Sequence, residues 1–321
     1  MIKKSYATLY YTLFPHLSAT RKGHFSDFGG VFRLADSPEK KDNTRRRIRF
    51  FKRSGIPSIC MPFHGAAARK NAQKGLSMTL VYGHRGFSGV YPENTMLAFE
   101  KAYEAGADGI EFDVQLTKDG VPVIMHDENA VRTTGKDFWV KDLTLDEFKR
   151  LDAGYVKNGK FGFTPAPTLR EVMAFCAEKN FRMNIELKTG VFEYEGIEGM
   201  VADMLKEFGL SDTVLVSSFN HFSMMRFRKI MPEIRIGLLE ESWIINAGAY
   251  VKSLGADDYN PTVCFLNDET VADLRANGLG INTWTVNSEE EMRRTIRYGV
   301  EIGISNWPDR YLEIRREMCG K

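Results

Sequence analysis

The sequence predicts an α/β fold, a (β/α)8 barrel with a small β-hairpin inserted after the second strand. From Met78 onward, short β-rich segments alternate with amphipathic helical segments. This alternation is typical of a parallel sheet covered by helices. Eight such strand segments can be identified, which is the number that closes a barrel. The chain has 321 residues, and one barrel typically uses roughly 250 of them.

The expected strands and several helix starts can be placed along the chain. Three helices should begin at capping boxes, in which a Ser or Thr and a Glu three residues later satisfy backbone amides that the helix leaves unpaired. These boxes are Thr144 with Glu147, Thr168 with Glu171, and Ser288 with Glu291. The eight expected strands are residues 79–83, 109–113, 182–188, 213–219, 235–240, 257–260, 280–286 and 303–307.

Two further helices are expected from apolar periodicity. In residues 196–208, apolar side chains recur every three or four positions, and Gly209 provides a left-handed stop. Asn94 is expected to cap a second helix. The face of this helix toward the sheet should consist of Ala98, Phe99, Ala102 and Tyr103.

A tight β-hairpin is expected between the second and third strands. Asp119-Gly120 separates two extended runs there, and Asp-Gly between such runs is a strong hairpin signal. A hairpin centred on this dipeptide pairs His126 opposite Asp113. The hairpin therefore brings a second histidine beside the acidic residues of the neighbouring strand.

Composition is that of an ordinary globular protein, with 43% hydrophobic and 27% charged residues. The longest apolar runs are as short as strands, so we expect no transmembrane segment. The 4 cysteines are scattered without a CxxC pair, which favours reduced thiols over a zinc site or disulfides. We therefore expect a cytoplasmic protein, with export as the alternative.

Charge divides the chain near residue 78. Residues 1–77 contain 16 Lys and Arg and 4 Asp and Glu (net +12), whereas residues 78–321 contain 28 and 38 (net −10). The basic segment lacks strand or helix periodicity, so we expect a flexible or artefactual extension before a catalytic domain at 78–321. A basic arm for nucleic acid or another anionic surface is the alternative. No nucleic-acid partner is expected for the barrel itself.

Acidic residues stand at successive expected strand ends, where barrels of this kind place their reactive groups. Glu111 and Asp113 lie on one strand and face the same way, and Glu186 lies on the next parallel strand. Three carboxylates that converge resist joint ionisation unless a hard cation such as Mg²⁺, Ca²⁺ or Mn²⁺ binds them. The competing interpretation is that they form salt bridges with Arg85 and Lys188.

Two histidines, His84 and His126, also fall at expected strand ends. Because imidazole titrates near neutral pH, such a pair can divide general acid and general base catalysis across one breaking bond. Arg85 and Lys188 add donors suited to a phosphate. A structural role for either histidine and plain ion pairing for the basic residues are the alternatives. Together the set predicts metal-assisted attack on a phosphorus ester.

The order and spacing of several motifs resemble those of the glycerophosphodiester phosphodiesterase family over about residues 80 to 310. The motifs are HRG at 84–86, PENT at 92–95, EFDVQLTKDGVPVIMHD at 111–127, IELK at 185–188, SSFN at 217–220 and WTVN at 284–287. The resemblance implies a TIM barrel that hydrolyses a small-molecule glycerophosphodiester to glycerol 3-phosphate and an alcohol. It also implies attack of the glycerol hydroxyl on phosphorus, as in related phospholipase-type barrels.

The resemblance further implies roles for individual residues. Glu111, Asp113 and Glu186 look like the ligands of one divalent cation, Mg²⁺ or Ca²⁺, and His84 and His126 look like the acid/base pair. The residues that resemble the family's substrate contacts are Arg85, Glu93, Lys188 and the aromatic wall Trp284. The alternative for the tryptophan is a core position on its strand.

The sequence departs from the family pattern at one pair of residues, and it leaves two other functions possible. Ser305-Asn306 stands where the family usually has Thr-Asp, so a charge is missing, and we expect altered substrate fit without loss of chemistry. A related phosphodiesterase would act on lysophospholipids or other phosphoesters, and an apolar rim at the barrel mouth would favour a lipid. A barrel that only binds phosphoesters would have lost a ligand or a histidine, and none is lost here.

Overall fold

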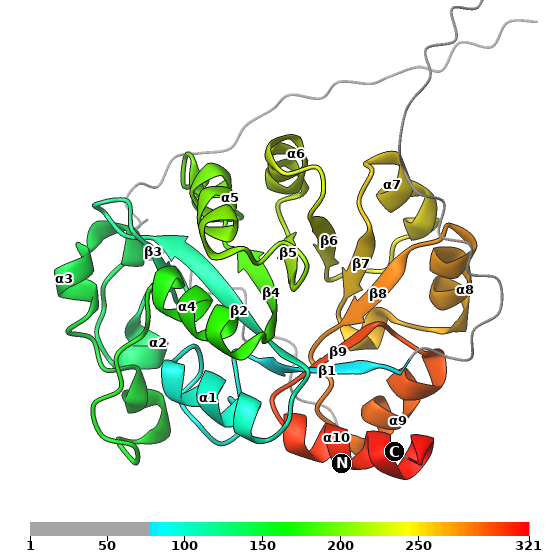
Figure 1. The fold of residues 1–321 in the computed structure, drawn as a ribbon, viewed down its shortest axis with the longest axis horizontal. Helices are drawn as coiled ribbons and strands as arrows, with labels where there is room; N and C mark the ends of the chain where they lie inside the picture. The colour runs from blue at the N-terminus through cyan, green and yellow to red at the C-terminus, as the bar shows by residue number, and fades with distance from the viewer. Residues whose placement is uncertain (1–77, 321) are drawn as a thin grey trace, which may run out of the picture. The chain divides into compact units, whose positions relative to one another are not determined.

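The computed structural model of the chain describes residues 78–320, which form a closed barrel of parallel strands surrounded by helices (Figure 1). The barrel strands are β1 (Leu80–His84), β2 (Gly109–Leu116), β4 (Arg182–Leu187), β5 (Val214–Ser218), β6 (Arg235–Glu240), β7 (Asp258–Pro261), β8 (Gly280–Thr283) and β9 (Ile302–Ser305). The ring closes because β1 pairs in parallel with both β9 and β2. The predicted (β/α)8 barrel is therefore confirmed.

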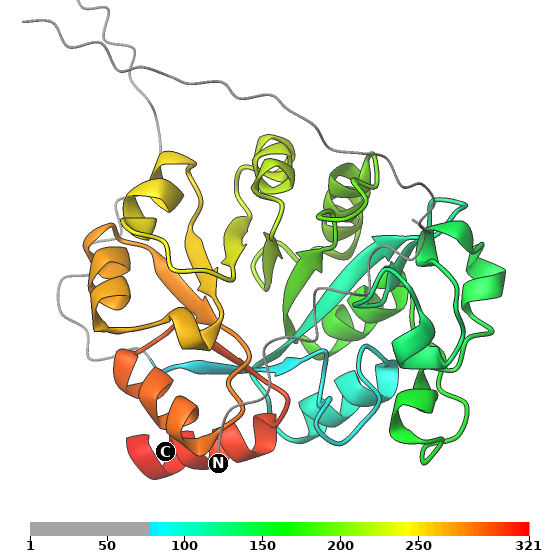
Figure 2. The ribbon, with the colours of Figure 1, turned by 180° about the vertical axis from the view of Figure 1, so that it is seen from behind.

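Helices follow the strands and form the outer layer, as the view from behind also shows (Figure 2). They are α1 (Met96–Glu104), α4 (Leu169–Lys179), α5 (Ile197–Phe208), α6 (His221–Ile230), α7 (Ala247–Ser253), α8 (Asp268–Ala276), α9 (Glu289–Tyr298) and α10 (Pro308–Cys319). All three predicted capping boxes are present. Gly209 ends α5 with a left-handed backbone, as predicted.

The predicted cap of α1 is wrong by one residue. Thr95 is the N-cap, and its hydroxyl accepts a hydrogen bond from the amide of Ala98 at 3.2 Å. Asn94 has a φ of +55°, whereas an N-cap residue has an extended backbone. Of the four apolar residues predicted to face the sheet, Tyr103 stays 41% exposed and the other three are buried.

The inserted hairpin consists of β2 and β3 (Pro122–Ile124), which pair in antiparallel fashion. It leads into two short helices, α2 (Val131–Thr134) and α3 (Leu145–Phe148). The predicted register is wrong by one residue, because Asp113 lies opposite Met125 and not opposite His126. The amide of Thr117 bonds the carbonyl of Val121 at 3.0 Å, so the loop has three residues and not the two that a hairpin centred on Asp-Gly needs.

Successive side chains of a barrel strand point alternately to the helix layer and to the barrel interior. Ile110, Phe112 and Val114 of β2 point outward into the main hydrophobic core under the helices, where the rings of Phe112 and Phe99 lie 5.7 Å apart. Glu111 and Asp113 point to the other side, into the barrel. The helix layer therefore supplies the apolar packing, and the barrel interior is free to carry polar groups.

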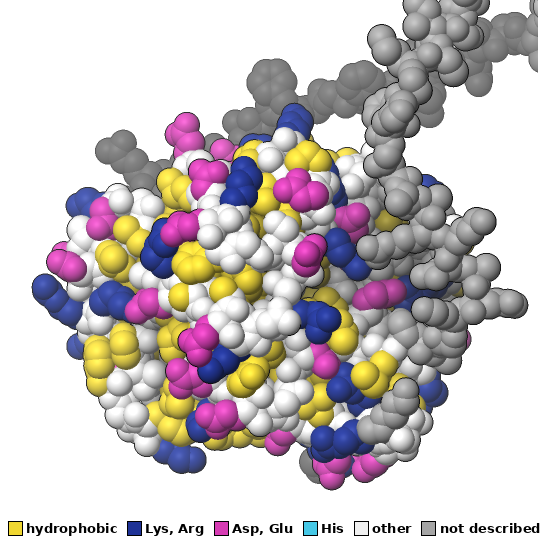
Figure 3. All heavy atoms as spheres, viewed as in Figure 1, with side chains coloured by type: hydrophobic (Ala, Val, Ile, Leu, Met, Phe, Trp, Pro, Cys, Tyr) yellow, Lys and Arg dark blue, Asp and Glu magenta, His cyan; other side chains and the backbone are white. Residues whose placement is uncertain are grey.

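The surface drawn in Figure 3 intersperses Lys and Arg with Asp and Glu among apolar side chains. Several of these form surface ion pairs such as Arg170 with Glu207, and such pairs typically contribute little to stability. Within residues 78–320, no helix is long and apolar enough to cross a bilayer. The basic segment, residues 1–77, lies outside the described residues, so its predicted boundary stays a prediction.

The capping box of α4 should make a measurable contribution to stability. Thr168 accepts a hydrogen bond from the amide of Glu171, whose carboxylate in turn accepts one from the Thr168 amide at 2.7 Å. Thr168→Ala should lower the free energy of unfolding by about 1 kcal/mol, read from urea unfolding curves. Thr270→Ala, which removes no cap hydroxyl from α8, is the control and should stay within about 0.5 kcal/mol. Equal losses in both variants would contradict the capping role.

Candidate active site

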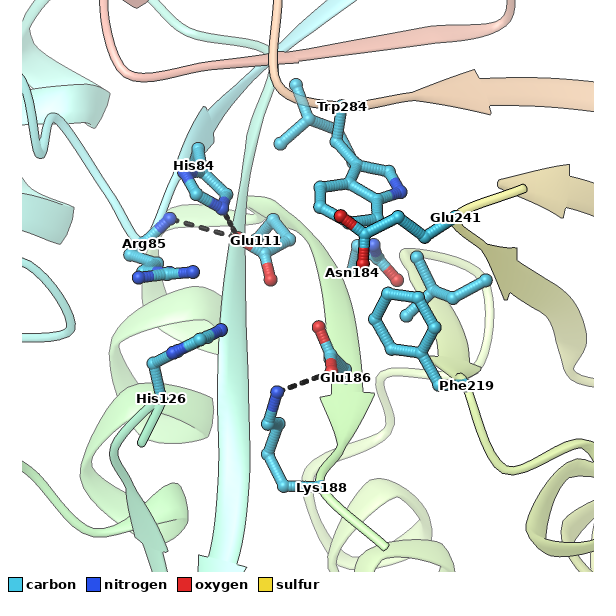
Figure 4. Close-up of a pocket in the computed structure, with 12 residues that line it drawn as sticks. His84, Arg85, Glu111, His126, Asn184, Glu186, Lys188, Phe219, Glu241 and Trp284 are labelled. Carbon is cyan, nitrogen blue, oxygen red and sulfur yellow. Dashed lines mark hydrogen bonds and ion pairs between the residues drawn. The ribbon is translucent and has the colours of Figure 1, made fainter. Parts of the chain in front are cut away.

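A cavity of about 380 Å³ opens at the carboxyl ends of the barrel strands (Figure 4). Seven of the nine predicted site residues line it. The other two, Glu93 and Asp113, lie behind the cavity wall and contact residues that line it. The structure thus brings together residues that span more than half of the barrel sequence. The lining residues predicted from the sequence are His84, Arg85, Glu111, His126, Glu186, Lys188 and Trp284.

The three predicted carboxylates converge as expected. Each of Glu111, Asp113 and Glu186 offers one oxygen within 4.8 Å of the others. The strand register explains this proximity, because Asp113 on β2 is paired directly with Glu186 on β4. All three residues are at most 9% exposed. The cluster therefore lies on the inner wall of the barrel rather than on the outer surface.

Asp113 is the most constrained of the three. Its Oδ2 accepts a hydrogen bond from Asn94 Nδ2 at 2.9 Å and lies 3.4 Å from Arg85 Nε. Burial alone would raise the pKa of this carboxyl, but the charges of His126, Arg85 and Lys188 outweigh burial and hold the pKa below its usual range. Its Oδ1 is buried without a hydrogen-bond partner. Lys188 Nζ lies 3.9 Å from this oxygen, which therefore has an ion pair but no hydrogen bond.

The pKa values of the other two carboxylates are shifted in the opposite direction, upward. Burial, followed by the charges of Asp113 and Glu186, raises the pKa of Glu111 well above its usual value. Burial and the charge of Asp113 also raise the pKa of Glu186, although Lys188 Nζ lies 3.0 Å from its Oε1. The three carboxylates are buried, their pKa values are shifted in different directions, and one oxygen accepts no hydrogen bond. Such a cluster fits a hard divalent cation, whose preferred ligands are oxygens.

His84 is held at one side of the cavity. Its Nδ1 lies 2.6 Å from Oδ1 of Asn306, and its Nε2 lies 3.9 Å from a carboxylate oxygen of Glu111. Burial, followed by the charge of Arg85, lowers the pKa of His84 to about 3. Because an amide oxygen only accepts, the contact with Asn306 leaves the proton on Nδ1 and the Nε2 lone pair toward the cavity. Asn306 touches the histidine and does not line the cavity.

His126 follows β3 and has a different partner. Its Nδ1 lies 2.5 Å from Asp127 Oδ1, and Asp127 is held from behind by Nε and Nη2 of Arg132 at 2.5 and 3.2 Å. Burial disfavours the charge of Asp127, but the hydrogen bonds from His126 and Arg132 outweigh it and keep the pKa of that carboxyl below its usual range. Because a carboxylate only accepts hydrogen bonds, this contact places a proton on Nδ1 and fixes the orientation of the imidazole.

The sequence left open whether Arg85 and Lys188 form ion pairs or face the site, and in the structure they do both. Arg85 Nη1 donates to Glu93 at 2.9 Å, and Glu93 also receives two hydrogen bonds from Arg132, at 2.7 and 2.8 Å. Lys188 is paired with Glu186. Arg85 and Lys188 are thus ion-paired and at the same time line the cavity. Their carboxylate partners hold them in place, and the planar fork of Arg and the point charge of Lys are donors of the kind that suit a phosphate.

The opposite wall of the cavity is largely apolar. Trp284, Phe219 and Leu239 line it together with Glu241. In Figure 4, Trp284, Phe219 and Glu241 lie across from the two histidines. Trp284 is partly buried and packs against a buried cluster that contains Leu215 and Ile304, so it both lines the cavity and contributes to the core. Glu241 follows directly after β6 and was not singled out from the sequence. The rule that led to Glu186, a polar residue at a strand end, would have found it.

Sequence reasoning also missed the residues that support the histidines. Asp127 and Arg132 lie within or just beyond the motif that contains His126, but only the folded loop shows that they contact each other. Asn94 was assigned to helix capping, whereas its amide contacts Asp113. The sequence signal for such a role would be a polar residue beside a motif with no secondary-structure task of its own.

Comparison with known proteins identifies the family. The glycerophosphoryl diester phosphodiesterase family matches residues 84–310. A glycerophosphodiester phosphodiesterase of Bacillus altitudinis is 42% identical over 244 residues, which cover 75% of this chain and 100% of that protein. One of Caldanaerobacter subterraneus subsp. tengcongensis is 41% identical over 239 residues, covering 74% and 98%.

A solved structure agrees with the sequence matches. An Oleispira antarctica phosphodiesterase in complex with the product sn-glycerol-3-phosphate superposes with a TM-score of 0.69 and 29% identity, covering 74% of this chain and 96% of that one. Its TM-score extends the agreement from sequence to the barrel fold. The chain therefore belongs to the glycerophosphoryl diester phosphodiesterase family and is a TIM-barrel enzyme of that family.

Proposed function

We propose that the enzyme hydrolyses glycerophosphodiesters to sn-glycerol 3-phosphate and an alcohol, with one divalent cation and with His84 and His126 as the acid/base pair. The observation that carries this proposal is the convergence of three carboxylates, two histidines and two basic residues on one cavity. The relatives' names and the product bound to the Oleispira enzyme support the substrate class.

The carboxylates Glu111, Asp113 and Glu186 would hold the cation, and Mg²⁺ and Ca²⁺ both suit their oxygens. When bound, such a cation polarises a phosphoryl oxygen and offsets the charge that develops on it. Arg85 and Lys188 line the same cavity and would bind the remaining phosphoryl oxygens. Together these groups would place phosphorus between the two imidazoles.

The two histidines have different hydrogen-bond partners, and this difference suggests which one acts as the base and which one as the acid in the first step. His84 contacts the neutral Asn306, so its Nε2 is suited to accept the proton of the glycerol hydroxyl that attacks phosphorus. His126 contacts the carboxylate of Asp127, so it is suited to carry the proton that the departing alcohol oxygen receives. The first step thus forms a cyclic glycerol phosphate and releases the alcohol. In the second step, water would attack its phosphorus, with His126 accepting a proton from the water and His84 returning a proton to the glycerol oxygen that leaves.

The direct test is an assay of sn-glycerol 3-phosphate release from a panel of glycerophosphodiesters, with and without added Mg²⁺ or Ca²⁺. The panel should include glycerophosphocholine, glycerophosphoethanolamine and glycerophosphoglycerol. We expect release that requires the cation. Tight binding of these diesters without release would instead support the barrel that binds phosphoesters and does not cleave them.

One observation favours a second substrate class, the lysophospholipids. Exposed apolar side chains follow the cavity residues Phe219 and Glu241 closely in the chain: Phe222, in the first turn of α6, is 81% exposed, and Trp243 and Ile245, on the loop after β6, are 56% and 89% exposed. Such a rim suits an acyl chain. Turnover of lysophosphatidylcholine at a rate comparable with that of glycerophosphocholine would support this candidate, and no turnover of it would exclude this candidate.

Asp127 should be needed for orientation of His126. Asp127→Asn keeps the shape of the side chain but removes the negative charge that faces both the imidazole and Arg132. We expect kcat to fall by about 10- to 100-fold, part of the 10²–10⁴-fold that an acid/base group contributes, with little change in KM. Asp137→Asn, on the same insertion, is the control and should retain wild-type kcat. An unchanged kcat in Asp127→Asn would show that His126 does not depend on this contact.

A further inference from the structure

The apolar wall of the cavity contains two aromatic rings at a right angle. The rings of Phe219, after β5, and Trp284, after β8, have centroids 5.5 Å apart and an interplanar angle of 86°. Trp284 Nε1 donates to the carbonyl of Asn260 at 2.9 Å, which fixes the indole. The two rings therefore form a corner whose faces carry the negative potential of aromatic π-systems.

A carboxylate stands in the same wall. Glu241 lines the cavity beside Trp284 and Phe219. Its side chain forms no hydrogen bond or ion pair with another residue in the part of the chain that the structure describes. Across the cavity lie the cationic Arg85 and Lys188, with the two histidines and the carboxylates of Glu111 and Glu186 beside them. The cavity thus has one end suited to a phosphate and another end that would repel it.

We propose that this second end, Glu241 with Trp284 and Phe219, is a subsite for the positively charged group of the substrate's alcohol. The favoured substrates are then glycerophosphodiesters of cationic amino alcohols, such as glycerophosphocholine and glycerophosphoethanolamine. The proposal rests on the proposed function, because the phosphate must lie at the basic end. Such zwitterions match the cavity in sign at both ends, and aromatic faces together with a carboxylate are a chemically suitable site for an ammonium group.

The test compares a cationic with a neutral leaving group in the full-length enzyme. We expect Glu241→Gln to lower kcat/KM for glycerophosphocholine by about three- to tenfold, mainly through KM, as the loss of one partly exposed charge contact implies. For glycerophosphoglycerol, whose alcohol is neutral, kcat/KM should stay within about twofold. Glu241→Lys should reverse the preference. Glu195→Gln, an exposed carboxylate on the loop after β4, should change neither substrate.

An equal decrease for both substrates would overturn the subsite, because it would place Glu241 against the glycerol that they share. No change for either substrate would also overturn it. Wild-type enzyme that cleaves neither diester would contradict the proposed function instead. In that case, binding at the subsite can be measured without turnover, by saturation-transfer NMR of glycerophosphocholine. The same measurement applies to enzyme from which the cation has been removed by a chelator. The trimethylammonium protons should receive more saturation from wild type than from Glu241→Gln, and equal saturation would refute the subsite.

Discussion

Replacement of His126 by alanine is expected to lower kcat for glycerophosphocholine by about 10²–10⁴-fold, the usual contribution of a general acid. In the first step, which releases the alcohol, the loss of rate should be much smaller with a nitrophenyl ester of glycerophosphate. Nitrophenolate leaves without a proton, so a missing general acid matters less. The expectation follows from the place of His126 in the cavity wall and from its contact with Asp127 at 2.5 Å, which holds the imidazole in one orientation. The measurement is the single-turnover rate of alcohol release from both substrates at a fixed cation concentration, together with kcat for glycerophosphocholine.

His84→Ala is the matched variant for this experiment. The attacking hydroxyl is the same in both substrates, so loss of the base should lower kcat equally for the choline and nitrophenyl esters. Both histidines are partly exposed, and neither truncation should prevent folding, which circular dichroism can check. Near-normal turnover of His126→Ala would refute the two-histidine mechanism. If the loss with the nitrophenyl ester were smaller in His84→Ala and not in His126→Ala, His84 would be the general acid and His126 the general base.

Removal of the divalent cation is expected to abolish turnover and lower the melting temperature. Addition of Mg²⁺ or Ca²⁺ to chelated enzyme should raise Tm by about 5 °C or more once its concentration reaches about 100 times the dissociation constant. The reason is that Glu111, Asp113 and Glu186 are buried with oxygens within 4.8 Å of one another. A cation bound among them stabilises only the folded chain.

Glu111→Gln separates this site from a general salt effect. It removes a proposed ligand and a negative charge from the cluster, so we expect loss of turnover and loss of the cation-dependent increase in Tm. Glu195→Gln, on an exposed loop, should keep both. The cation assignment would fail if activity survived EDTA, or if Glu111→Gln still showed the full increase in Tm.

The barrel could be predicted from the sequence because its determinants are local. Alternation, capping boxes and the glycine after residue 208 each act within a few residues of the chain. The two misplaced details are local as well. Asp119-Gly120 signals a turn but does not reveal that the loop has three residues, and Asn94 and Thr95 are both acceptable caps until the backbone of Asn94 is known to be left-handed.

The candidate site was predicted to the extent that strand ends and strand alternation define it. Glu111, Asp113 and Glu186 could be grouped because parallel strands end at the same edge of a barrel. The contacts of Asn306 with His84 and of Arg132 with Glu93 join residues far apart in the chain. No periodicity records such contacts, because they depend on how loops from different strands meet.

The sequence by itself determined the barrel, its inserted hairpin and the chemical types that gather at the strand ends. Only the tertiary structure decided that one histidine contacts an amide and the other a carboxylate, and that Glu241 shares a wall with Trp284 and Phe219. The physical reason is that hydrophobic periodicity and turn chemistry are properties of short segments. The charge and hydrogen bonding of a site arise instead from side chains that barrel closure brings within a few ångströms.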